Sequence, residues 1–234
     1  MLKRWLSRHL YGLGLLLTGK HDIAVLVYFL LLFPGVLAHE LSHWLSAKLL
    51  RVPTGRISIG PSKKGGGATR FGSVSVAKTD PLRGSLIGLA PLLTGSILIL
   101  VIAYLVFGLA APEELPINLG AEDMLWTLRG YVAVPNFWLW VYLIFSVSNA
   151  MLPSETDRQA WFSLGLYCIL AILVLYGLGL LQQVPYEISI PLLNALNHLS
   201  FAFLVTIVVD GAVIVVVFLL ERVVMLLTGR KVEY

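Results

Sequence analysis

The sequence predicts an all-α polytopic membrane protein with about five transmembrane helices, an N-terminal amphipathic helix and a small membrane-surface β-hairpin. Of its 234 residues, 58% are hydrophobic and 13% are charged, whereas a soluble domain is about half apolar and about a quarter charged. The apolar residues also form blocks about as long as a bilayer crossing requires. These two observations exclude a soluble globular protein.

The first 22 residues predict an interfacial amphipathic helix rather than a signal peptide. Lys3, Arg4 and Arg8 precede an apolar run that is short and is not followed by a small-residue cleavage site. Apolar side chains recur at helical spacing between these basic residues. They are Leu2, Trp5, Leu6, Leu10, Leu13 and Leu17.

Five longer apolar segments follow, and we interpret the chain 1–234 as one integral membrane domain with a catalytic core over 23–180. No internal repeat indicates a second unit. The segments cover residues 23–50, 85–107, 134–151, 158–181 and 193–228.

The basic residues predict the orientation of these segments. If all five cross, the N-terminal stretch and the 108–133 loop share one side with five of the 17 Lys and Arg, and the other twelve lie opposite. The richer side is then cytoplasmic by the positive-inside rule. We expect the lipid bilayer as a partner, no nucleic acid, and the cell membrane of a prokaryote as the location.

The loop 51–84 predicts a cytoplasmic β-hairpin. Residues 56–59 and 71–76 alternate apolar and polar side chains on either side of a Gly-rich turn at 63–68. An edge of such a hairpin can bind an extended peptide. The alternative is a flexible basic loop that touches anionic lipid. In the next loop, residues 124–132 predict a short surface helix on the outer side.

The sequence His39-Glu40-Leu41-Ser42-His43 lies within the first long segment. On a helix, positions four apart share one face, so His39 and His43 can bind one Zn²⁺ ion. Glu40 is then placed to take a proton from a water on that metal. Two histidines and a glutamate in an apolar helix are costly in lipid, which favours a functional role over solvated side chains at a helix end.

The depth of this motif suggests the third ligand. Residues 39–43 lie about 24 to 30 Å into a hydrocarbon layer of about 30 Å, near the cytoplasmic boundary. Asp157 opens a later segment from the same side and is expected at the same depth. Asp210, in the middle of the last segment, is the rival third ligand, but it is expected about 15 Å deep.

Together these motifs resemble the site-2 protease family of intramembrane zinc metalloproteases, which combine H-E-x-x-H with a later Asn-Pro...Asp-Gly motif. The resemblance covers about residues 23–180. It implies His39, His43 and Asp157 as zinc ligands, Glu40 as general base and Asn149 beside the bound peptide. The second motif departs from the family pattern, because Pro153 is shifted and Arg158 replaces the usual glycine.

The function that we expect is regulated cleavage of transmembrane segments. The substrate would be a single-pass membrane protein whose helix unwinds, since an intact helix hides its carbonyls. The edge strand, with Phe71, Ser73 and Val74, is the candidate to hold the unwound segment. Two alternatives remain: a non-proteolytic metal-binding protein, either a pseudoprotease or a carrier, and a metallopeptidase with a glutamate ligand.

Overall fold

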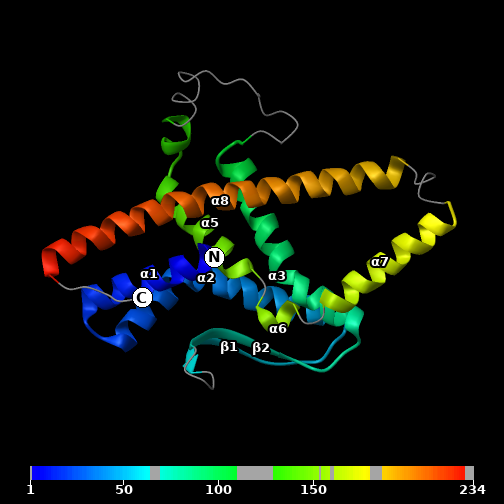
Figure 1. The fold of residues 1–234 in the computed structure, drawn as a ribbon, viewed down its shortest axis with the longest axis horizontal. Coiled ribbons are helices and arrows are strands. Elements are labelled where there is room, and N and C mark those ends of the chain that lie inside the picture. The colour runs from blue at the N-terminus through cyan, green and yellow to red at the C-terminus, as the bar shows by residue number, and fades with distance from the viewer. Residues whose placement is uncertain are drawn as a thin grey trace.

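The computed structural model describes residues 2–63, 69–109, 129–152, 154–158, 161–179 and 186–229. Its helices pack around α2, and one β-hairpin lies along the side of this bundle (Figure 1). In chain order the elements are α1 (Leu2–Thr18), α2 (His21–Leu49), β1 (Thr54–Lys63), β2 (Thr69–Val76), α3 (Pro81–Val101), the π-helical turn η1 (Ile102–Val106), α5 (Phe137–Met151), α6 (Glu155–Arg158), α7 (Trp161–Gly177) and α8 (Tyr186–Thr228).

In the described part of the chain, three helices are long and apolar enough to cross a membrane, two fewer than the five that the sequence predicts. They are His21–Leu49, Pro81–Val106 and Ser189–Thr228. The other two predicted segments form shorter apolar helices. Residue Asn136, in the left-handed conformation at φ 58°, sets the start of α5 at Phe137, so that α5 keeps only 15 residues or about 22 Å.

Helix α2 is in the centre of the bundle and contacts α1, α3, α5 and both strands. Its closest approach to α5 is at Gly35, whose N–H donates to Ser146 Oγ at 2.9 Å. A Cβ atom at Gly35 would collide with the Ser146 carbonyl. The missing side chain therefore lets the two backbones touch, as small residues do between membrane helices.

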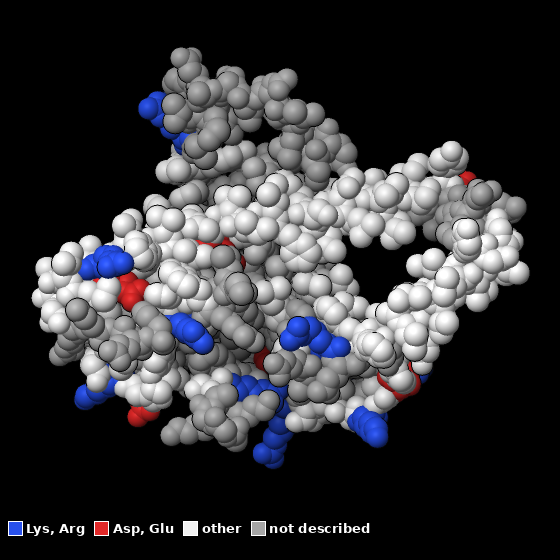
Figure 2. Space-filling view, in the orientation of Figure 1, with Lys and Arg blue, Asp and Glu red and all other residues white. Residues whose placement is uncertain are grey.

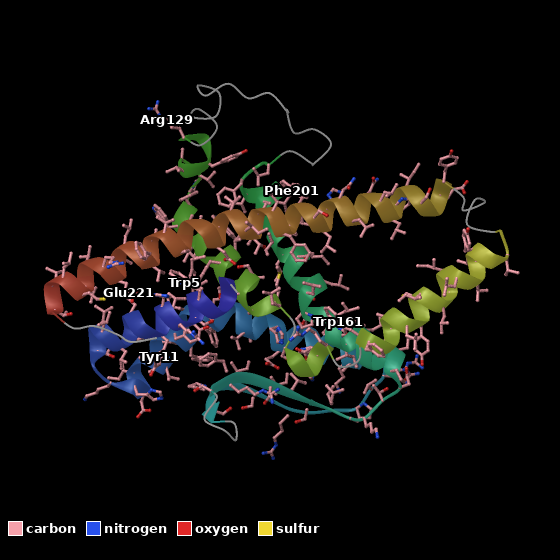
Figure 3. The ribbon with its side chains drawn as sticks, viewed as in Figure 1. Trp5, Tyr11, Arg129, Trp161, Phe201 and Glu221 are labelled. Atoms are coloured by element: carbon pink, nitrogen blue, oxygen red, sulfur yellow. The ribbon has the colours of Figure 1, made fainter. Side chains whose placement is uncertain are left out.

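The predicted N-terminal helix is present as α1, and it packs on α2 and α8. Leu6, Leu10 and Leu16 are buried, whereas Leu17 is 62% exposed. His9 Nδ1 lies 2.6 Å from Oε2 of Glu221, which Figure 3 labels on α8. These apolar and polar contacts make α1 part of the bundle.

The hairpin predicted in the loop 51–84 is confirmed. β1 and β2 pair antiparallel in a two-stranded sheet, with Ile57 opposite Val74 and Ile59 opposite Gly72. The Phe71 ring packs on the rings of Tyr28 and Phe29 and so anchors β2 to α2. The tip of the hairpin, residues 64–68, lies outside the described residues.

Helix α3 follows the hairpin and begins with a side-chain cap. Asp80 Oδ1 accepts a hydrogen bond of 2.9 Å from the backbone N–H of Arg83. This bond lowers the pKa of the Asp80 carboxyl below its ordinary value and satisfies one of the free N–H groups of the first turn. The cap fixes the residue at which α3 starts. It thereby sets which residues of α3 lie opposite α2.

Figure 1 shows α7 and the first half of α8 extending away from the bundle. Their side chains are mostly apolar and exposed, as expected of helices that face lipid. The helix predicted over 124–132 falls mostly outside the described residues.

The face of the molecule in Figure 2 is largely uncharged, and its Lys and Arg gather mainly along the lower edge, toward the hairpin. The exposed basic residues of the hairpin and the adjoining helix ends are Lys48, Arg51, Arg56, Arg70, Lys78 and Arg83.

Candidate metal centre

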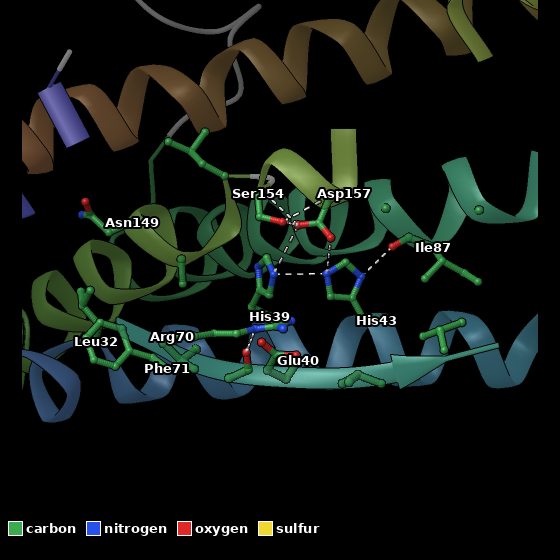
Figure 4. A pocket seen from close by; sticks show the side chains of 18 of the residues that line it. Leu32, His39, Glu40, His43, Arg70, Phe71, Ile87, Asn149, Ser154 and Asp157 are labelled. Atoms are coloured by element: carbon green, nitrogen blue, oxygen red, sulfur yellow. Dashed lines mark hydrogen bonds and ion pairs between the residues drawn. The ribbon is translucent and has the colours of Figure 1, made fainter. Parts of the chain in front are cut away.

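His39 and His43 project from the same face of α2, one turn apart (Figure 4). Their Nε2 atoms lie 3.2 Å from each other. This is the juxtaposition that the sequence spacing predicts. Two imidazole nitrogens at this separation can ligate one metal ion, or one of them can donate a hydrogen to the other, so a proton competes with the metal.

The orientation of His43 is fixed from α3. Its Nδ1–H donates to the carbonyl oxygen of Ile87 at 2.9 Å, in a buried position. A carbonyl oxygen only accepts, so the hydrogen of a neutral His43 ring is on Nδ1. Nε2 therefore keeps its lone pair, which is the arrangement that a carbonyl oxygen bonded to the other ring nitrogen gives to metal-binding histidines.

Asp157 meets the two histidines from the one-turn helix α6. Its Oδ1 lies 3.4 Å from His43 Nε2 and its Oδ2 lies 3.9 Å from His39 Nε2. Ser154 holds the carboxylate, because its N–H and O–H both donate to Oδ2, at 2.8 and 2.6 Å. The N–H of Asp157 donates back to Ser154 Oγ, which completes a reciprocal cap on α6.

The three side chains offer ligand atoms for one metal ion, all within 4.8 Å of one another. Tetrahedral ligands at about 2.0 to 2.1 Å from zinc are about 3.3 Å apart. The distances from His43 Nε2 to His39 Nε2 and to Asp157 Oδ1, 3.2 and 3.4 Å, are close to this value, and the other oxygen of Asp157, Oδ2, lies 3.9 Å from His39 Nε2. Asp157 Oδ1 and the lone pair of His43 Nε2 are both acceptors, so their approach requires a cation or a proton between them. Among the described residues, these three form the only such group found.

Glu40 lies beside this group and is only 6% exposed. The backbone of β2 covers it: a Cβ atom at Gly72 would lie 2.5 Å from Glu40 Oε1. The nearest charged groups that act on it are Arg70 and Asp157. Arg70 bends along the strand, with its Nε donating to the Gly72 carbonyl at 2.6 Å, and Figure 4 shows its guanidinium beside the Glu40 carboxylate.

A cavity of about 890 Å³ opens next to the metal group. Residues of α2, α3 and β2 line it together with Asp157, and the β1 residues do not. Of the predicted peptide-binding residues in the hairpin, Phe71 and Val74 line the cavity and Ser73 does not. Because β1 pairs with one side of β2, the other edge of β2 has no strand partner among the described residues.

Asp210 and Asn149 form a separate buried group. Asp210 Oδ1 accepts hydrogen bonds from Ser148 Oγ at 2.9 Å and from Asn149 Nδ2 at 3.1 Å. The Asn149 amide also donates to the Phe145 carbonyl. Asn149 lines the cavity, but its side chain is held by these partners at a distance from the histidines (Figure 4).

Sequence reasoning missed several residues that shape the site. Ser154 was detectable, because Ser-x-x-Asp at residues 154–157 is the pattern of a helix cap. The Ile87 carbonyl carries no side-chain signal. Gly72 and Arg70 owe their roles to how β2 lies on α2, which the alternating pattern of the strand does not specify.

Comparison of the chain with protein-family models, with curated proteins and with solved structures finds no match in any of the three.

Proposed function

We propose that the chain is an intramembrane zinc endopeptidase of the site-2 protease type. One observation supports this most strongly: His39, His43 and Asp157 converge with their ligand atoms within 4.8 Å of one another, and Glu40 lies on the same helix as the first two. Three protein ligands and one free position are the usual donor set of a catalytic zinc site. A site that only stores metal has no need of the buried carboxylate Glu40.

Each residue has a distinct task in this proposal. His39, His43 and Asp157 would hold zinc, which when bound polarises a scissile carbonyl and makes water a stronger acid. Glu40 takes the proton of the attacking water and delivers it to the leaving amine. The Ile87 carbonyl and Ser154 keep His43 and Asp157 in their ligating orientations.

The substrate that fits this site is a transmembrane segment in extended form. Residues of β2 line the cavity, and the edge of β2 that faces away from β1 has no strand partner among the described residues. This edge is our candidate for binding the peptide, because its backbone N–H and C=O groups can pair with an added strand. We further propose the arrangement with five crossings, in which α5 and α7 span together with adjoining residues. The metal site and the hairpin then lie near the cytoplasmic side of a prokaryotic cell membrane.

The test compares wild type with Glu40→Gln in detergent micelles, using a labelled peptide with one apolar segment of about 20 residues. We expect both proteins to bind one zinc ion and cleavage to fall by about 10²- to 10⁴-fold in the variant, the range typical of general-base catalysis. The control is Asp22→Asn, which removes an exposed acid from the far end of α2 and is expected to cleave normally.

Equal cleavage by wild type and Glu40→Gln would contradict the proposal. Zinc binding without any cleavage by the wild type would favour the alternative of a non-proteolytic metal-binding membrane protein.

A further inference from the structure

One turn of α3 touches two of the three candidate ligands. The carbonyl of Ile87 accepts the hydrogen bond from His43, and the next residue, Gly88, faces the backbone of Asp157. Ile87, Gly88 and both ligands line the same cavity. The position of this turn therefore affects the distance between Asp157 on α6 and the two histidines on α2.

Gly88 leaves no room for a side chain. A Cβ atom there would lie 2.5 Å from the carbonyl oxygen of Asp157 and 3.4 Å from its carbonyl carbon. The same Cβ atom would lie 3.4 Å from Trp161 Nε1. The indole therefore limits how far the added methyl group could move away from Asp157. Contacts between carbon and oxygen begin at about 3.3 Å, so one methyl group requires a shift of about 0.8 Å.

The shift falls on α6 rather than on α3. Helix α3 has 21 residues and packs on α2, α5 and α8. Helix α6 has four residues, too few to be stable without its surroundings. Metal–ligand distances in zinc sites lie within about 0.2 Å of their usual values, and a displacement of Asp157 by about 0.8 Å is larger than this range.

We propose that Gly88 positions the third metal ligand: the absence of a side chain at this point of α3 lets α6 come close enough for Asp157 to share a metal ion with His39 and His43. This inference rests on the metal site of the proposed function, but not on proteolysis. Gly88 itself has no side chain that could ligate a metal. Loss of such positioning contacts lowers metal affinity by about 10- to 100-fold.

The experiment measures the zinc dissociation constant of the purified full-length protein in detergent by competition with a chromogenic chelator. Gly88→Ala is expected to bind zinc about 10- to 100-fold more weakly than wild type. The matched control is Gly95→Ala, which adds the same methyl group to α3 against the side chain of Met151 and should leave zinc affinity unchanged. Because a methyl group in a packed helix also lowers stability, the rise in Tm that zinc produces is compared within each variant.

A double-mutant cycle separates positioning from general damage. In the Asp157→Ala background the third ligand is already gone, so adding Gly88→Ala should lower zinc affinity no further. Unchanged affinity in Gly88→Ala alone would overturn the inference, as would an equal loss in both backgrounds. If Gly88→Ala weakens zinc binding only when Asp157 is present, but wild type cleaves no peptide, the proposed function fails and the inference stands. If wild type binds no zinc, both fail.

Discussion

Asp157 and Asp210 are two carboxylates with opposite environments. Asp210 faces hydrogen-bond donors, the Ser148 hydroxyl and the Asn149 amide, so the protein alone satisfies its buried oxygen. Asp157 has donors from Ser154 on one oxygen, while its other oxygen approaches His43 Nε2, an acceptor. A carboxylate that meets an acceptor needs a cation or a proton between the two atoms. The kind of atom that surrounds each acid, more than its depth, makes Asp157 the better candidate for a metal ligand and Asp210 a residue that the protein alone satisfies.

The largest expected effect comes from exchanging each acid for alanine. Asp157→Ala should weaken zinc binding by more than about 100-fold, since it removes a ligand and not merely a neighbour of one. Asp210→Ala should retain wild-type zinc affinity. Chelator competition on both purified proteins measures the difference. Equal losses of zinc affinity in the two variants would contradict the assignment of Asp157 as a metal ligand and of Asp210 as a structural residue.

A smaller effect is expected when the donors of each acid are removed. Ser154→Ala deletes the hydroxyl that holds Asp157 Oδ2 and should lower zinc affinity by about tenfold, the low end for residues that hydrogen-bond to a metal ligand. Ser148→Ala removes the corresponding donor to Asp210 and serves as the matched control with unchanged zinc affinity. If Ser148→Ala loses as much zinc as Ser154→Ala, the two groups are not independent.

The smallest effect concerns stability around Asp210. Asp210→Ala leaves the Asn149 and Ser148 donors without this acceptor and should lower the free energy of unfolding by about 1 to 2 kcal/mol, as polar contacts between membrane helices do at most. Asp210→Asn keeps an acceptor oxygen and should lose less. Reversible unfolding in mixed micelles measures both. A loss in Asp210→Asn as large as in Asp210→Ala would contradict the role as acceptor.

The sequence predicted best those features that depend only on the spacing of residues along one helix or one strand. The spacing of His39 and His43 places both on one face of any helix, so their juxtaposition required no tertiary information. The hairpin was also predictable, because alternation over 56–59 and 71–76 has the period of a strand. The choice of Asp157 over Asp210 came from counting crossings; the structure places Asp157, and not Asp210, beside His39 and His43, and its role as a metal ligand stays a prediction.

Other features depend on packing that no local pattern encodes. The close contact between Gly88 and Asp157 requires the crossing of α3 by α6, and the cover of Glu40 depends on where β2 rests on α2. Two of the five predicted segments form shorter helices in the described part of the chain, because an apolar run does not show where the backbone turns. Asn136 interrupts such a run in the left-handed conformation, which asparagine adopts more readily than most residues.

The reciprocal cap on α6 links metal binding to local folding. Asp157 holds Ser154 through the cap and would hold the metal through its other oxygen, so the same side chain joins a one-turn helix to the bundle. Part of the binding free energy is then used to order this turn, and the measured affinity includes a local opening equilibrium. Removal of the ion would release α6 to exchange its amide hydrogens with solvent while α2 and α3 stay protected.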